Sequence, residues 1–474
     1  MAVKVLHINF NNIQSEQYQR FDAKYYVVDD FFNELSKKQK FAVATLAELK
    51  EQIISGSYID TYTKKEQGIP YLRVGDIKPF SFDENEVDFV YVSPEVDEKI
   101  KIKENDILIA RTQATIDKLG TASIADKHNS NWATSQHTTR IRVNEKKISP
   151  FYLLAYLNSK FFKAQTALAS HGSTRVEFTH SQLNKVRVFI PEKELYNEIV
   201  LQVKTIIEYN RQANILIEEA KEIFKQAISL NGTNTKQPYF ETDLLSLKEF
   251  DIWNATCHLP FFASNEKELK TKFATVKLGE ITNIKKGDEV GSNNYDVYIN
   301  KTNTDYAFIR TSDIVNHEID LFPDYFVSQN IYNSVNQELK AGDILFTKDG
   351  KIGQTAIVTQ ADKAIIASGI ARIRIKKNEH NITPEYLFTV LSLKETGYNP
   401  AIRRTVIGTT IPHLREERLK QIAIPILDKQ TTDKISQKIK TAFELKAKRK
   451  NLICLVLEEL NTEYLKYNDY KNQS

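Results

Sequence analysis

The chain has 474 residues, enough for two or three domains with cores of ordinary size, and a globular composition of 41% hydrophobic and 27% charged residues. Its net charge of +4 is small for a nucleic-acid-binding protein but does not exclude one, because the 65 basic residues can be gathered on one face. No apolar run approaches the roughly 20 residues of a membrane span, and the N-terminus lacks a secretory signal pattern, so we expect a cytoplasmic protein that does not bind a membrane. Two cysteines, Cys257 and Cys454, are too few for a disulfide framework or a zinc cluster, and we expect both in the core.

The first half of the chain, residues 1–190, is predicted to be a mixed α and β domain with an N-terminal lead-in. Short β-type runs occupy 107–110, 138–143 and 186–190, and a helical pattern covers 150–159. A long helix is predicted over 191–230, since neither Gly nor Pro follows Pro191 up to residue 228 and good helix formers fill its outer faces.

The second half repeats this order. A polar linker at 231–245 leads to a second mixed domain at 246–425, with β-type runs at 344–347, 370–375 and 422–424 and a helical pattern at 384–393. A second long helix is predicted over 426–466, followed by a short tail at 467–474.

The two halves match residue by residue at many points, which indicates an internal duplication. Arg73 recurs as Arg310 and Asp106 as Asp343, each 237 residues later, and Lys40 recurs as Lys272 after a shift of 232. Such nearly constant shifts are typical of one ancestral unit that was doubled and then acquired small loop insertions.

Both long helices carry a heptad seam, whose spacing alternates between three and four residues. In the first helix the seam consists of Ile199, Val203, Ile206, Asn210, Ala213, Ile217, Ala220 and Phe224. Adding 236 gives the second seam, Ile435, Ile439, Ala442, Lys446, Arg449, Ile453, Val456 and Leu460. The equal register favours pairing of the two helices with each other, with polar residues fixing the register, while a generic core face on each helix remains the alternative.

The sequence contains no motif of an active site. It has no phosphate-binding glycine loop, no dinucleotide-binding turn, no zinc-protease helix and no box typical of amino methyltransferases, and its nine histidines are scattered singly. We therefore expect a non-catalytic chain without a cofactor or metal of its own.

Loops that follow equivalent strands in the two halves are the candidate contacts with DNA. Basic, amide and hydroxyl side chains there are the types that bond base edges and phosphates. The candidates are Arg111, Thr112, Gln113, Lys118, Ser173, Thr174, Arg175, Lys348, Lys351, Arg403, Arg404 and Thr410. A solvated basic loop explains each loop alone equally well, and an internal ion pair explains Arg73 with Asp76 as well as phosphate contact does; only the recurrence in both halves favours the DNA interpretation.

The order of these motifs resembles the DNA specificity subunit of type I restriction-modification systems. The resemblance is carried by 71–77 with 308–314, by 105–109 with 342–346, by the run 342–353, by 20–26 with 250–253, and by a proline before each long helix. Two departures concern the first half, which has Asn105 in place of Gly342 and whose run 111–114 lacks the glycine found at Gly350.

The resemblance implies an α+β fold with two similar target recognition domains, each followed by a long helix, and the two helices packed as an antiparallel coiled coil that acts as a ruler. It implies that each domain binds half of a bipartite site in double-stranded DNA. It also implies that the helices dock two methyltransferase (M) subunits, and that restriction and translocation (R) subunits join the complex. S-adenosylmethionine, ATP and Mg²⁺ are then expected only on those partner subunits.

Two other functions fit the same residues. One is a duplicated scaffold whose lobes bind protein partners rather than DNA, and salt dependence of binding separates it from a DNA reader. The other is a specificity module of a different methylation-based defence system, which the neighbouring genes would distinguish.

Overall fold

The computed structural model describes residues 41–84, 89–113, 118–169, 176–231, 240–241, 255–297, 305–335, 337–376, 380–407 and 411–469. The described residues up to Glu208, together with those from Leu452 onward, form one compact unit, and those from Tyr209 to Asn451 form the other. The predicted linker, apart from Asn231 and the pair at 240–241, and both motifs at 20–26 and 250–253 lie outside the described residues.

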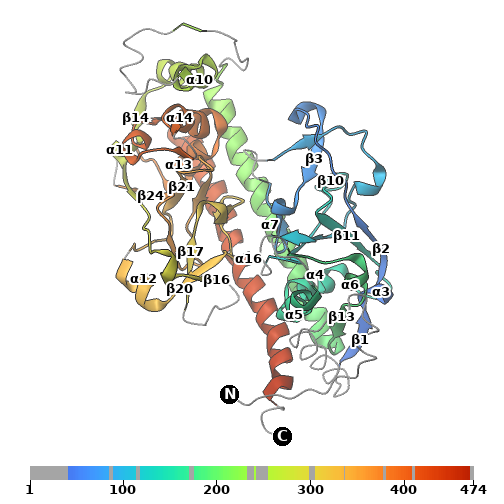
Figure 1. The fold of residues 1–474 in the computed structure, drawn as a ribbon. Coiled ribbons are helices and arrows are strands. Elements are labelled where there is room, and N and C mark those ends of the chain that lie inside the picture. Colours follow the sequence, from blue (N-terminus) through green and yellow to red (C-terminus); the bar gives the residue numbers. More distant parts are fainter. Residues whose placement is uncertain are drawn as a thin grey trace. The chain divides into compact units, whose positions relative to one another are not determined.

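The first unit is built on a four-stranded antiparallel sheet in the order β2-β11-β7-β9. A second, three-stranded sheet has the order β10-β3-β6, and β1 pairs with β13 where the domain chain enters and leaves. The strands are β1 (Ala42–Thr45), β2 (Lys50–Ser55), β3 (Ile69–Leu72), β6 (Tyr91–Val92), β7 (Ile107–Ala110), β9 (Ala122–Ile124), β10 (Ala133–Thr134), β11 (Thr138–Val143) and β13 (Arg187–Ile190). Helices α4 (Pro150–Asn158), α5 (Lys160–Ala169) and α6 (His180–Asn184) lie between β11 and β13 in the chain (Figure 1).

The second unit repeats this topology with one more strand, β16, which pairs with β20. Its four-stranded sheet has the order β15-β24-β21-β22, the neighbouring sheet has the order β16-β20-β17-β23, and β14 pairs with β27. The strands are β14 (Thr275–Lys277), β15 (Thr282–Lys286), β16 (Asp296–Val297), β17 (Tyr306–Ile309), β20 (Tyr325–Val327), β21 (Ile344–Thr347), β22 (Thr355–Ile357), β23 (Ala364–Ile366), β24 (Ile370–Ile375) and β27 (Ala423–Pro425). Its main helices within the domain are α10 (Pro260–Lys272), α13 (Pro384–Ser392) and α14 (Asn399–Arg403).

Equivalent local interactions build the two units. Ser149 and Thr383 cap α4 and α13, each followed by proline at the first helical position, where no amide donor is needed. One turn later, Tyr152 donates to the carbonyl of Phe189, and Tyr386 donates to the carbonyl of Pro425. Both domains thus have the same helix cap and the same tyrosine hydrogen bond, and the hydrogen bond anchors the helix to the last strand of the domain.

Two long helices complete the units, α7 (Lys193–Ile228) and α16 (Lys429–Asp469). They run antiparallel: Gln202 bonds Glu459 within the first unit, and within the second unit Asn214 lies 3.5 Å from Lys446 and Glu219 lies 2.6 Å from Lys438. The predicted α+β fold with two similar domains and a packed antiparallel helix pair is confirmed.

The structure buries the predicted seam. Every apolar seam residue is buried, whereas Asn210 is half-buried and its Oδ1 has no hydrogen-bond partner among the described residues. In the second unit, seam residues such as Ile217 and Ile435 share one core with the sheet residue Phe346 and with α13. The seam there pairs the helices and covers the domain at the same time.

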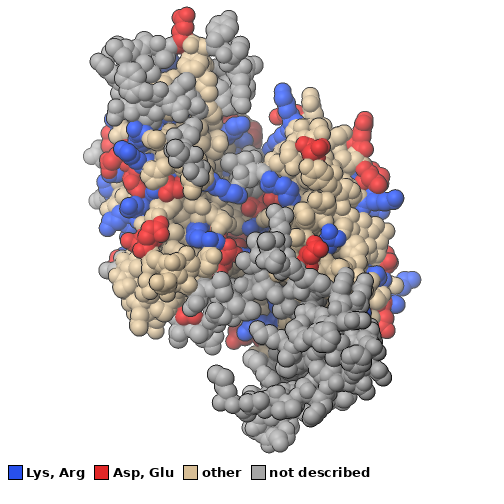
Figure 2. Space-filling model, in the orientation of Figure 1, with Lys and Arg blue, Asp and Glu red and all other residues tan. Residues whose placement is uncertain are grey.

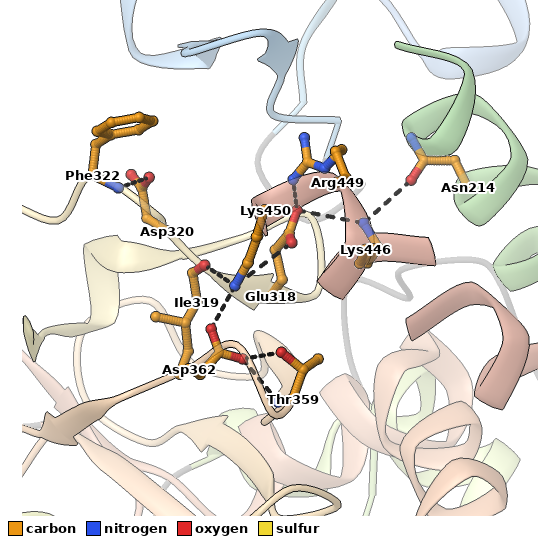
Figure 3. Close-up of polar contacts among 10 residues, drawn as sticks. All are labelled: Asn214, Glu318, Ile319, Asp320, Phe322, Thr359, Asp362, Lys446, Arg449 and Lys450. Atoms are coloured by element: carbon orange, nitrogen blue, oxygen red, sulfur yellow. Dashed lines mark hydrogen bonds and ion pairs between the residues drawn. The ribbon is translucent and has the colours of Figure 1, made fainter. Parts of the chain in front are cut away.

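Three basic residues of α16, Lys446, Arg449 and Lys450, are buried against the second domain. They meet Glu318 and Asp362 of that domain, and we call these five residues the α16 ionic cluster (Figure 3). Glu318, on the hairpin of β18 (Ile314–Val315) and β19 (Glu318–Ile319), accepts a hydrogen bond from Arg449 and lies 3.6 Å from Lys446 and 3.7 Å from Lys450. Lys450 also binds Asp362 at 2.7 Å. Burial lowers the pKa of Lys446 to about 8 despite the attraction of Glu318. The cluster fixes this segment of α16 to the domain.

One expectation about the core is wrong. Cys257 is buried, but Cys454 is exposed, because it follows the seam residue Ile453 in α16 and does not lie on the buried seam itself. Among the described residues, no helix is both long enough and apolar enough to cross a bilayer.

Candidate nucleic-acid interface

In the first unit, the chain that leaves β7 meets a distant segment at the end of the sheet. The amide of Arg111 donates to the carbonyl of His137, and β8 (Thr112–Gln113) then pairs with β12 (Val176–Glu177). This ladder brings the loop that begins at Arg111 next to the segment that directly follows residues 173–175. The described ends of two loops that were predicted separately from the sequence, 111–113 and 176–177, therefore lie side by side.

The second unit has the same backbone arrangement after β21. The amide of Lys348 donates to the carbonyl of Gly369, and the amide of Leu414 donates to the carbonyl of Lys348, as Phe178 does to Arg111 in the first unit. Asp349 and His413 form an antiparallel bridge that corresponds to the pairing of Thr112 with Glu177. The two halves thus share a framework at this position and differ in the side chains that it carries.

The turn before each of these strands explains one departure from the family pattern. Asn105 has φ +69° and Gly342 has φ +90°, so both adopt the left-handed conformation. Asparagine is among the few residues that tolerate it. The amide of Asn105 donates to the carbonyl of Ala125, which directly follows β9, and the amide of Gly342 donates to the carbonyl of Val358, which directly follows β22, both at 2.9 Å. The first half therefore keeps the turn without glycine.

Two acid–base pairs that follow the same turn were missed by the sequence reasoning. Asp106 binds Arg142 at 2.7 Å, and Asp343 binds Arg374 at 2.6 Å. The matched sequence runs contained these residues, but nothing in the spacing showed that they meet.

For Arg73 and Arg310, the geometry supports internal pairing. Asp76 accepts from the backbone amide of Arg73, and Asp313 accepts from that of Arg310, both at 2.8 Å, and each arginine side chain lies within 4 Å of the same carboxylate. Burial raises the pKa of Asp313 to about 6, with Asp320 and Asp324 adding to the shift. These pairs close the turn that begins the β18–β19 hairpin and its counterpart.

Arg111 is the strongest cationic candidate of the first unit. Its Nη1 donates to the Ser55 hydroxyl at 3.3 Å, and that hydroxyl lies 2.9 Å from Nε2 of His180. Burial and the positive charges of Arg111 and Lys50 lower the pKa of His180. Within the described chain, no carboxylate lies at ion-pair distance from Arg111, and its buried Nε has no hydrogen-bond partner.

The equivalent cation of the second unit is neutralised. Lys348 is buried, with Nζ 2.9 Å from Asp349 and 3.8 Å from Glu416. Asp349 also accepts a hydrogen bond from His413. Lys348 therefore holds acidic side chains in place, and its role as a direct contact with DNA stays a prediction that this burial does not favour.

Arg403 and Arg404, which were also predicted as DNA contacts, have an acidic partner inside the second unit. Both are buried, and both bind Glu266 of α10, at 2.8 Å and at 2.5 Å. Burial raises the pKa of Glu266, but the hydrogen bond and charge of Arg404 and the charge of Arg403 outweigh it and hold the value at about 2. The two arginines pin α14 to α10 inside the second unit.

The remaining candidates have mixed positions. Thr112 is buried and donates to Glu177, Gln113 and Lys118 are half-buried, and Lys351 is exposed. Ser173, Thr174, Arg175 and Thr410 lie outside the described residues.

On the face drawn in Figure 2, Lys and Arg alternate with Asp and Glu over both units, and neither sign covers a broad area. The described surface visible there thus carries its basic residues in small groups, in keeping with the low net charge.

Comparison with known proteins gives a family match over most of the chain. The model of the type I restriction modification DNA specificity domain matches residues 11–219 and 270–454, one segment in each half. None of the curated proteins compared with this chain matches it.

Solved structures that this chain matches include a type I restriction-modification S subunit from M. genitalium, at 13% identity and TM-score 0.38, covering 89% of this chain and 96% of that one. The HsdS subunit from Thermoanaerobacter tengcongensis is 16% identical, with TM-score 0.27 and coverage of 88% and 96%. Since the family model matches both halves and well over half of the residues, the chain belongs to the family of type I restriction modification DNA specificity domains.

Proposed function

We propose that the chain is the DNA-reading subunit of a type I restriction-modification complex, and that each of its two domains reads one half of a bipartite site. The observation that carries this proposal is what we call the strand-end framework, the set of backbone hydrogen bonds around Arg111 and Glu177 in the first unit and around Lys348 and His413 in the second. These backbone bonds are equivalent in the two units, but the side chains at equivalent positions differ. A duplicated reader needs equal geometry to approach equal DNA backbones. It needs unequal side chains to select different bases.

The proposed contacts are the strand-end loops, with Arg111, Gln113, Lys118 and Lys351 from the described residues and Ser173, Thr174, Arg175 and Thr410 from the adjoining segments. In this role the chain works beside DNA in the cytoplasm and has no catalytic part. Methylation and cleavage would belong to M and R subunits, with S-adenosylmethionine, ATP and Mg²⁺ bound there.

The helix pair is proposed to set the unread gap between the half-sites and to dock the partners. Large apolar side chains are exposed on the helices: Leu201 on α7 and Leu455 on α16 in the first unit, and Ile215 on α7 in the second. Contiguous exposed apolar patches mark interaction sites, and we propose that Leu201, which is 67% exposed, belongs to one. Leu201→Glu should abolish co-purification with the M subunit while the far-ultraviolet circular dichroism stays unchanged, and retained binding would argue against this docking face.

The experiment that tests the proposed function is methylation mapping. The chain is co-expressed with the products of its neighbouring genes, and methylated adenines are mapped by sequencing. We expect two short specified sequences separated by a fixed unspecified gap, whereas an uninterrupted site, or none, would refute the proposal.

Salt dependence separates DNA reading from the alternative of a protein scaffold. If the complex contacts phosphates, the logarithm of its affinity for a duplex falls linearly with the logarithm of salt concentration. A scaffold that binds only protein would show no such slope for DNA.

A further inference from the structure

Glu177 and His413 occupy equivalent positions at the ends of the two strand-end frameworks. Glu177 pairs with Thr112 across the β8–β12 ladder, and His413 pairs with Asp349 across the corresponding bridge. Both are exposed, and 49% of the His413 side chain is open to solvent. The backbone at both positions is held by the ladder, so each side chain projects from a fixed point.

The hydrogen-bonding characters of these two residues differ. The hydroxyl of Thr112 donates to Oε2 of Glu177 at 3.4 Å, which leaves a carboxylate that can only accept further bonds. Nδ1 of His413 is hydrogen-bonded to Oδ1 of Asp349, whose Oδ2 accepts from the buried Lys348. Because a carboxylate accepts, Nδ1 carries the proton, and Nε2 is the ring atom left for a ligand.

Different residues hold the two exposed side chains in place. Lys348 is buried and holds Asp349, and Asp349 in turn orients the imidazole. In the first unit, Thr112 is buried behind Glu177 in the position of Asp349. Each exposed group therefore has a buried residue that fixes its direction, as a group that discriminates between ligands requires.

We propose that Glu177 and His413 are specificity-determining residues that contact base edges, one in each half-site. This inference rests on the proposed function. Glu177, as an acceptor, selects cytosine or adenine, which present an exocyclic amino donor in the major groove. His413 reads one base of the other half-site through its Nε2, and Asp349 is its positioning residue.

The test uses the complete complex of the chain with its M subunits, acting on a duplex library in which both half-sites are randomised. Sequencing of the methylated molecules gives the base preference at every position. The variants are Glu177→Gln, His413→Gln and Asp349→Asn. Glu95→Gln and His128→Gln, at exposed positions away from the strand-end frameworks, are the matched controls.

We expect Glu177→Gln to lower the preference for cytosine or adenine at one position of one half-site by about tenfold, which corresponds to about 1.4 kcal/mol, because the amide can also donate to guanine or thymine. His413→Gln should alter one position of the other half-site only. Asp349→Asn should alter that same position to a smaller extent, an effect that a purely structural role would not produce.

Variants that keep the wild-type preference at every position, in a complex that still methylates specifically, would overturn this inference and leave the proposed function standing. A wild-type complex without any sequence preference would overturn both. Since Glu177 and His413 are exposed, replacing either of them does not endanger the fold.

Discussion

The α16 ionic cluster offers a strong test of how the second domain is held on its helix. Glu318 is 3% exposed and faces three cations, of which Lys446 and Lys450 lie within 4 Å and Arg449 donates a hydrogen bond to it. The change Glu318→Gln keeps the shape and removes the negative charge. Of the two carboxylates in the cluster, Asp362 then remains beside three buried positive charges.

Breaking a buried ion pair by removing one partner costs about 3–5 kcal/mol, because the remaining charge stays out of water. Glu219→Gln is the matched control, since Glu219 also pairs with a lysine of α16, at 2.6 Å from Lys438, but is half exposed. An exposed pair of this kind contributes about 0–1 kcal/mol. The two substitutions therefore differ in cost because of burial, with the residue change held constant.

Native-state hydrogen exchange read by mass spectrometry is the suitable assay, because a chain with two units need not unfold in a single step. Peptides from β19 and from the part of α16 around Lys446 should lose several kcal/mol of opening free energy in Glu318→Gln, and Lys446→Met should restore part of it. Equal effects of Glu318→Gln and Glu219→Gln would refute the reasoning.

Three further predictions concern stability. Gly56→Ala should lower the melting temperature, since a Cβ there would lie 2.0 Å from the carbonyl oxygen of Thr134 and such overpacking costs about 1–3 kcal/mol or more; Gly75→Ala, with no atom within 4 Å, is the control and should change little. Glu266 has a pKa of about 2 against an ordinary value of 4.5, so its stabilisation is present above pH 4.5 and is lost as the pH falls towards 2; the stability difference between wild type and Glu266→Gln in denaturant unfolding should therefore shrink below pH 4.5, and a difference independent of pH would contradict this. Lys446, with a pKa of about 8 against 10.5, is costly to bury while charged, so wild type should gain stability relative to Lys446→Met as the pH rises through this window; an unchanged difference in thermal unfolding between pH 7 and pH 10 would contradict this assignment.

The sequence predicted the framework well because each signal was local. The strands at 107–110, 138–143, 344–347 and 370–375 have the bounds expected from their β-type runs, and the duplication located their partners in the other half. The heptad spacing likewise predicted both long helices and their buried face. Period and propensity depend on neighbours along the chain, which a sequence displays directly.

The candidate site was predicted less well because charge pairing is not local. Arg403 and Arg404 resembled a basic surface pair, but their acid, Glu266, lies in another helix far along the chain. Lys446 and Arg449 stood out as charges within an apolar seam, and the position of Glu318 could not be derived from that spacing. Glu177 and His413 were missed for the same reason, since only the pairing of strands shows that they are equivalent.

The measurement that most directly tests the central claim is the spacing of the recognised site after the helices are shortened. Removing seven residues from both α7 and α16 near the boundary of the two units, at Glu208 and Asn451, keeps the seam in register because seven residues are close to two helical turns. It shortens the pair by about 10 Å, or about three base pairs of DNA at about 3.4 Å each. Methylation sequencing should then show both half-sites unchanged and the gap between them shorter by about this amount, whereas an unchanged gap would contradict the claim that the helix pair sets the distance between two readers.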